Sequence, residues 1–286
     1  MSDPSPQVEQ QHISANSDKN ALQPSSVIGD LRLHRLRSKV FRNERMLRVW
    51  LPPGYDDAGN VQRYPVLYLN DGQNLFDRAT AYTGVEWQAD ETVDRLLREG
   101  VIPPIVMVGI DNAAADRVKE YVPYRMFNPP VLRPLGRKYP EFLVDEVMPF
   151  VGQQYRVARG AANTGLGGSS LGGLIALFTA MVAPGVFGRL LVESPSLYMA
   201  NRQVLREART VREWPERIVV GVGTQETGRA EKDREIVEDV RNLERILQRA
   251  GLGEGRLRVR IEEGASHNEA AWAGRFGEAL RFLFGA

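Results

Sequence analysis

The sequence predicts an α/β protein, a single domain built on a mostly parallel central sheet with helices on both faces. Short, almost continuous apolar runs alternate with longer amphipathic stretches along most of the chain, which is typical of parallel strands and the helices that cover them. The 286 residues are 43% hydrophobic, enough to bury the core of one large domain. We find no internal repeat and no second domain in the sequence.

The predicted elements follow one another in a regular order. Alternating runs at residues 30–36 and 46–52 predict two antiparallel strands, joined near residues 42–44. After them, continuous apolar runs predict buried strands, and apolar residues at three- and four-residue spacing predict helices, some of which stop at glycine. In chain order these elements are strand 64–70, helix 89–100, strand 104–110, helix 139–155, strand 163–170, helix 171–183, strand 189–194, helix 202–209, strand 217–223, helix 232–251, strand 256–264 and helix 270–284.

Two segments depart from this alternation. Residues 1–27 are polar and rich in serine, glutamine and proline, so we expect a disordered tail in front of a folded domain at residues 28–286. Residues 112–138 are too long for an ordinary connection. They carry several prolines and six basic against two acidic residues, which favours a lid or a pocket wall, with a plain surface excursion as the alternative.

Charge and composition exclude several classes of partner. The 37 lysines and arginines nearly balance the 36 acidic residues, so a nucleic acid is not an expected partner. The absence of cysteine excludes disulfides, thiolate metal sites and thiol nucleophiles. The start of the chain has no basic and apolar leader, and nothing downstream approaches the roughly 20 unbroken apolar residues of a membrane span. We therefore expect no membrane contact and a cytoplasmic location.

A G-x-S-x-G pattern at residues 168–172 centres on Ser170. The neighbouring Ser169 does not fit, because leucine rather than glycine follows it two positions later. In a nucleophile elbow the serine lies on a strained strand-to-helix turn, and the two glycines let strand and helix cross closely. A strand is predicted before this turn and a helix after it, which favours the elbow over a glycine-rich turn without chemistry. A phosphate-binding loop is disfavoured, since no Gly-Lys-Ser/Thr follows.

A serine nucleophile needs a base, and the chain has three histidines. His12 lies in the polar tail and His34 in the first predicted strand, whereas His267 follows the last strand. The order nucleophile, then base, with the histidine after the last strand, is that of α/β hydrolases. The sequence therefore predicts that Ser170 and His267 act together.

The acid of such a site should lie between the serine and the histidine, on a loop after a strand. Glu226 is in this position, in RIVVGVGTQET, and a glutamate can hold the imidazole as an aspartate does. Glu231 and Asp233 follow closely, and Asp233 is the main alternative. A site that relies on the serine and histidine alone also stays open.

Acyl transfer requires two backbone N–H groups aimed at the oxyanion. The residue after the nucleophile, Leu171, should provide one of them. Gln73 should provide the other, from the turn DGQN that follows an early strand. In this turn Gly72 allows the chain to reverse, and we expect Asp71 and Gly72 to lie against the substrate.

With these residues in place, the chain resembles the esterase D and enterochelin-esterase-like group of α/β hydrolases, which also contains feruloyl and acetylxylan esterases. The resemblance runs from about residue 35 to the C-terminus. It is carried by VLYLNDGQNLF, VEWQADE, VGIDNAAADRVKEYVPY, EFLVDEVMPFVGQQYRV, GLGGSSLGG, VESPS, VGTQET and SHNEAAWAGR. The chain differs from many members in having Glu226 where they have aspartate.

The resemblance implies hydrolysis of a small-molecule ester with no metal and no cofactor. Ser170 would attack the ester, His267 would accept and return the proton, and water would release the acyl group. It also implies that Trp87, Ser194 and Trp272 line the substrate pocket, although the tryptophans could equally be core residues.

The identity of the substrate is less constrained. Short-acyl or aryl esters are the expected class for a carboxylesterase of this kind. A siderophore or feruloyl-type ester is the second candidate, because basic residues in the 112–138 segment could contact an anionic substrate, although they could also be a solvated surface run. An acyltransferase has the same site, and a non-catalytic binding protein of this fold is a further alternative.

Overall fold

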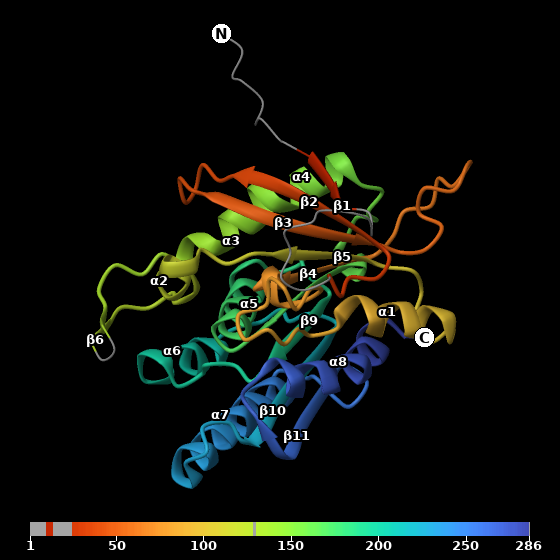
Figure 1. The fold of residues 1–286 in the computed structure, drawn as a ribbon. Coiled ribbons are helices and arrows are strands. Elements are labelled where there is room, and N and C mark those ends of the chain that lie inside the picture. Colours follow the sequence, from red (N-terminus) through yellow and green to blue (C-terminus); the bar gives the residue numbers. More distant parts are fainter. Residues whose placement is uncertain (1–9, 14–24, 128–129, 286) are drawn as a thin grey trace.

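The computed structural model describes residues 10–13, 25–127 and 130–285. Within these residues, a nine-stranded sheet runs through the molecule in the order β1-β2-β3-β5-β4-β8-β9-β10-β11 (Figure 1). The pairs from β1 to β5 are antiparallel, and every neighbouring pair from β5 to β11 is parallel. The strands are β1 (Gln10–Ile13), β2 (Asp30–Arg37), β3 (Glu44–Leu51), β4 (Val66–Asn70), β5 (Val106–Ile110), β8 (Thr164–Ser169), β9 (Arg189–Glu193), β10 (Arg217–Gln225) and β11 (Leu257–Ser266).

Helices cover both faces of this sheet, as the sequence predicts. Successive residues of a strand contribute to two separate apolar clusters. In β4, Val66 and Tyr68 belong to a cluster that includes residues of the helices at 171–182 and 230–249, whereas Leu67 and Leu69 belong to a cluster that includes residues of the helices at 89–98 and 269–284. The helices are α1 (Ala89–Arg98), α2 (Arg117–Tyr121), α3 (Tyr139–Glu141), α4 (Met148–Gln154), α5 (Leu171–Val182), α6 (Met199–Ala208), α7 (Ala230–Arg249) and α8 (Glu269–Phe284).

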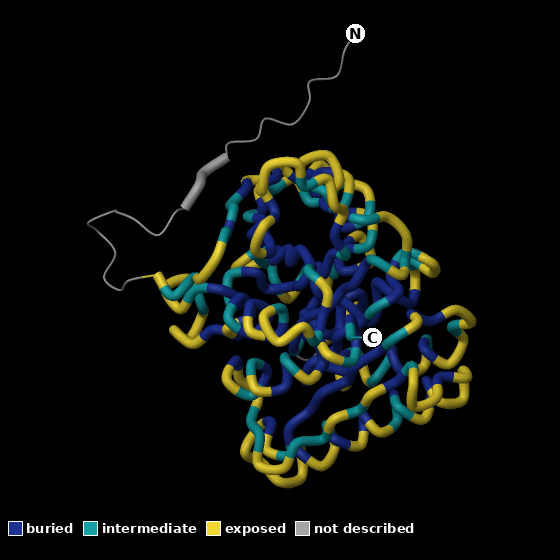
Figure 2. The backbone as a smooth tube through the Cα atoms, turned by 90° about the vertical axis from the view of Figure 1, so that its right-hand side faces the viewer, coloured by how far each residue is buried: buried dark blue, intermediate teal, exposed yellow. Residues whose placement is uncertain are grey.

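Shorter turns of helix complete the fold. The single helix expected at residues 139–155 is one helical run in which a π-helical stretch, η4 (Phe142–Val147), joins α3 to α4. Three-residue 3₁₀ turns are η1 (Gly72–Asn74), η2 (Ala114–Asp116), η3 (Gly136–Lys138) and η5 (Ala161–Asn163). Figure 2 shows the resulting burial, with buried residues in the interior of the molecule and exposed residues mainly on its periphery.

The predicted tail lies mostly outside the described residues. Four of its residues, Gln10–Ile13, form β1 and pair with β2. A polar sequence can add such an edge strand, since main-chain hydrogen bonds need no apolar side chain. At the end of the tail, Ser25 and Ser26 donate hydrogen bonds from their hydroxyls to Asp77 and Glu86.

The segment 112–138 is an ordered excursion where it is described. It contains η2, α2, η3 and a two-stranded hairpin, β6 (Met126–Phe127) with β7 (Pro130–Val131). Three of its six basic side chains form ion pairs within the described residues. Arg117 binds Asp71, and Arg137 binds Glu207.

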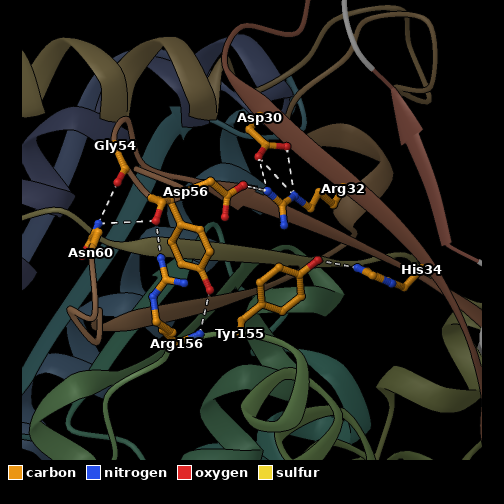
Figure 3. Close-up of polar contacts among 9 residues, drawn as sticks. Asp30, Arg32, His34, Gly54, Asp56, Asn60, Tyr155 and Arg156 are labelled. Carbon is orange, nitrogen blue, oxygen red and sulfur yellow. Dashed lines mark hydrogen bonds and ion pairs between the residues drawn. The ribbon is translucent and has the colours of Figure 1, made fainter. Parts of the chain in front are cut away.

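The antiparallel end of the sheet carries polar contacts of its own (Figure 3). Arg32 of β2 contacts Asp30 and Asp56, and Asn60 donates to the carbonyl of Gly54 at 2.7 Å. These contacts fix the loop between β3 and β4. His34 is 1% exposed and its Nε2 lies 2.5 Å from the Tyr155 hydroxyl, so this histidine belongs to the core.

Candidate active site

Ser170, not Ser169, occupies the turn between β8 and α5. Its φ of 57° and ψ of −123° lie in a region that costs a non-glycine residue conformational energy. A Cβ on Gly168 would lie only 2.8 Å from the carbonyl carbon of Gly172, so a side chain there would prevent the close crossing of strand and helix. Ser169 is the last residue of β8 and is 4% exposed. The glycines therefore hold Ser170 at the turn, in partial contact with solvent.

The two residues whose N–H groups are expected to bind the oxyanion lie in separate elements at this edge of the sheet. Leu171 begins α5, and Gln73 lies in η1, directly after β4. Among the described residues neither N–H group has a hydrogen-bond partner, as expected for the first residues of a helix. Asn70 ties the two elements together, because its Nδ2 donates to the carbonyl of Gly172 at 2.8 Å.

His267 and Glu226 form a hydrogen-bonded pair. His267 follows β11 and Glu226 follows β10, so the carboxyl ends of two neighbouring parallel strands bring them together. Nδ1 of His267 lies 2.5 Å from Oε2 of Glu226. Asp233 accepts the N–H and the hydroxyl of Thr227 instead. No hydrogen bond between Ser170 and His267 is present in the described part of the chain; catalytic contacts of this kind often tighten only in the complex with substrate.

The second oxygen of Glu226 is also occupied. Oε1 accepts the N–H of Gly223 at 2.6 Å and the Ser194 hydroxyl at 2.7 Å. Burial alone would raise the pKa of Glu226, but the hydrogen bonds from His267, Gly223 and Ser194 outweigh it and lower the pKa. The carboxylate is therefore ionised beside the imidazole at neutral pH.

The three residues that the resemblance assigns to the pocket are buried behind this pair. Ser194 is 2% exposed, Trp87 2% and Trp272 5%. Trp272 donates its indole N–H to the Ser194 hydroxyl at 2.9 Å, and its ring lies edge-on to His267 with centroids 5.1 Å apart. Trp87 packs against Trp272 at 6.0 Å. A substrate contact for Trp87, Ser194 and Trp272 stays a prediction. In the structure, Ser194 donates a hydrogen bond to Glu226, and Trp272 packs against His267.

Sequence reasoning missed a buried ion cluster next to these residues. Arg275 of α8 is 4% exposed and donates from Nε to Glu193 at 2.9 Å and from a terminal nitrogen to Glu262 at 2.7 Å. The main-chain carbonyl of Glu193 accepts the N–H of Ser170 at 2.9 Å. The available indication was the glutamate that ends the strand RLLVE, directly after three apolar residues. The cluster links the serine turn to α8.

This cluster predicts a pH-dependent contribution to stability. Burial, only partly offset by Arg275, raises the pKa of Glu193 to about 7. Because the folded state then holds this proton more tightly than the unfolded chain, the contribution of Glu193 to stability falls as pH rises from about 4.5 to 7. The full loss is about 3 kcal/mol at 1.36 kcal/mol per pKa unit.

Glu193→Gln should remove this dependence. We expect the variant to gain stability relative to the unsubstituted protein by about 2 to 3 kcal/mol between pH 5 and pH 8. Urea unfolding at both pH values measures the difference. A constant difference between the two proteins at the two pH values would show that Glu193 does not titrate in this range.

Other surface features lie apart from these residues. A groove of about 710 Å³ runs between α1 and α8, and its lining includes neither Ser170 nor His267. Within the described residues, no group of three or more acidic, histidine or cysteine side chains is arranged to hold a metal ion. None of the described helices combines the length and the apolar character needed to cross a lipid bilayer.

The fold and the serine turn define an α/β hydrolase. The chain belongs to the family described as "Putative esterase", whose model matches residues 38–283. The protein is therefore an esterase, a hydrolase of carboxylic esters, as the sequence predicts, and the alternative of a non-catalytic protein is not supported.

Individual proteins resemble the chain in sequence and in fold. The chain is 25% identical over 251 residues to YbbA of Bacillus subtilis, covering 84% of this chain and 93% of that protein. It resembles the structure of the siderophore hydrolase EstA from Aspergillus nidulans, with a TM-score of 0.70, 21% identity and coverage of 96% and 99% of the two chains. It also resembles the enterobactin esterase FES from Shigella flexneri, with a TM-score of 0.66, 18% identity and coverage of 90% and 59%.

Proposed function

We propose that the protein is a serine esterase that uses Ser170, His267 and Glu226 as a catalytic triad on short-acyl or aryl esters. The observation that carries the proposal is the 2.5 Å contact between His267 and Glu226, at the same edge of the sheet as the strained Ser170 turn. A histidine that donates its Nδ1–H to a buried carboxylate presents Nε2 as the base. The lowered pKa of Glu226 keeps that carboxylate ionised.

In the first half-reaction, the hydroxyl oxygen of Ser170 bonds to the ester carbonyl carbon, and its proton passes to Nε2 of His267. Glu226 stabilises the resulting imidazolium. The N–H groups of Leu171 and Gln73 donate to the oxyanion, each contributing about 3 kcal/mol to the stability of the transition state. As the ester C–O bond breaks, His267 returns the proton to the leaving alcohol.

In the second half-reaction, water attacks the acyl-enzyme. His267 removes a proton from the water and later returns it to Ser170, so the free acid leaves and the hydroxyl is restored. An alcohol in place of water would make the same site an acyltransferase. Hydrolysis is the proposed outcome because the family is one of esterases.

A series of p-nitrophenyl esters of increasing acyl length tests the proposal. We expect turnover without added metal and in the presence of EDTA, with kcat/KM highest for short acyl chains. Release of p-nitrophenol is followed by absorbance. No turnover of any member of the series would contradict the proposed substrate class.

A siderophore or other aryl-acid ester is the second candidate, supported by the described activities of the structural neighbours EstA and FES. Competition between a neutral aryl ester and a catecholate ester of the same alcohol separates the two candidates. A preference of tenfold or more for the catecholate ester would favour the second one. Equal kcat/KM values would favour the broad esterase.

A further inference from the structure

A buried carboxylate lies beside the first turn of α5. Asp71, between β4 and η1, is 4% exposed and has a left-handed backbone with a φ of 58°. A Cβ on Gly172 would lie 2.8 Å from Oδ2 of Asp71, so the carboxylate touches the second residue of the helix. Leu171 and Gln73, whose N–H groups are the proposed oxyanion donors, are neighbours of these two residues. This carboxylate therefore lies beside the residues whose N–H groups are proposed to bind the developing negative charge.

Arg117, the first residue of α2, pairs with this carboxylate through two parallel hydrogen bonds. Its Nε donates to Oδ1 of Asp71 at 2.7 Å, and a terminal nitrogen donates to Oδ2 at 2.7 Å. The guanidinium also stacks over the Tyr121 ring, 5.3 Å from its centroid. Burial would lower the pKa of Arg117, but Asp71 more than offsets it, so the pKa is raised and the guanidinium stays charged. The bidentate geometry fixes both position and charge.

A second residue of the same segment holds the same loop. Asn112 donates from Nδ2 to Oδ1 of Asp71 at 2.7 Å, and its main-chain N–H donates to the side-chain oxygen of Gln73 at 3.2 Å. The start of the 112–138 segment is thus bound to the loop that carries one proposed oxyanion donor. Nε and one terminal nitrogen of the Arg117 guanidinium are thus used by the carboxylate of Asp71.

We propose that Arg117 is a positioning residue that neutralises the buried carboxylate of Asp71 beside the proposed oxyanion donors; this inference rests on the proposed esterase function. A helix N-terminus stabilises an oxyanion through its N–H groups and its dipole. An uncompensated carboxylate a few ångströms away would oppose that stabilisation in the transition state, where the charge develops, more than in the neutral ground state.

The inference predicts an effect on kcat rather than on KM. Arg117→Met keeps the length of the side chain but removes its charge, and kcat for a neutral p-nitrophenyl ester should fall roughly thirtyfold, with KM within about twofold. Arg117→Lys keeps the charge and should lose about threefold to fivefold. The double variant Asp71→Asn/Arg117→Met removes both charges and should recover most of the lost kcat, and asparagine tolerates the left-handed backbone at this position.

Arg137→Met is the matched control. Arg137 lies in the same segment and also forms an ion pair, but with Glu207 on α6. We expect its kcat within about twofold of that of the unsubstituted protein. Circular dichroism and the Tm of each variant check that it is folded.

The outcomes separate the inference from the proposed function. A kcat of Arg117→Met equal to that of the unsubstituted, active protein would overturn the inference alone. A double variant as slow as Arg117→Met would also overturn it, because the loss would then not come from the charge of Asp71. If the single variant is unstable, a folded double variant with kcat roughly thirtyfold below that of the unsubstituted protein would overturn it equally. An unsubstituted protein that hydrolyses no ester would overturn the proposed function and this inference with it.

Discussion

Ser170→Ala should lower kcat for p-nitrophenyl ester hydrolysis by about 10⁴-fold or more, because it removes the only group proposed to bond to the acyl carbon. The substitution should leave the fold intact, because alanine can occupy the same strained turn without making new contacts. Steady-state kinetics on the purified variant, with the Tm as a check of folding, measures the effect.

Ser169→Ala is the matched control for this prediction. Ser169 has the same side chain one residue earlier, but it is the last residue of β8 and is 4% exposed. We expect its kcat within about fivefold of that of the unsubstituted protein. Comparable losses in the two variants would contradict the assignment of Ser170 as the nucleophile.

Glu226→Ala should have the second largest effect, a fall in kcat of about 10² to 10⁴-fold. Without the carboxylate, the Nδ1–H of His267 loses its acceptor, so neither the tautomer nor the imidazolium is stabilised. Ser194 and Gly223 would also lose the oxygen that accepts their hydrogen bonds. The same ester assay measures this loss.

Asp233→Ala is the comparison for Glu226. Asp233 accepts hydrogen bonds from Thr227 and makes no contact with His267 in the described structure, so only a loss of a few fold is expected. A larger loss in Asp233→Ala than in Glu226→Ala would transfer the role of the acid to Asp233.

The alternation of strands and helices was predictable because each element has a local sequence pattern. The buried strands are continuous apolar runs, and α7 and α8 have regularly spaced apolar residues. The turn at Ser170 was predictable for the same reason, since close crossing of strand and helix requires glycine at fixed positions on either side. His267 could be selected because it follows the last predicted strand, whereas His12 lies in the polar tail and His34 in the first predicted strand.

Other features depend on contacts between distant residues and leave no local pattern. The ion pair of Asp71 and Arg117 joins residues 46 positions apart, and either residue alone is typical of a solvated loop. The ion pair of Arg275 and Glu193 likewise joins distant residues, 82 positions apart, and leaves no local pattern. The strand β1 was not predicted because its polar side chains do not alternate with apolar ones. The sequence therefore predicted the proposed reacting groups, but it did not predict the ion pairs of Arg117 and Arg275 that lie around them.

The most direct test of the triad is covalent labelling of the protein with a fluorophosphonate, a reagent that bonds to activated serine hydroxyls. We expect one adduct per chain, located on Ser170 by peptide mass spectrometry, and much slower labelling in Glu226→Ala than in Asp233→Ala. An adduct on Ser169 or another serine, or no adduct on a folded protein that hydrolyses esters, would contradict the proposal that Ser170 is the nucleophile.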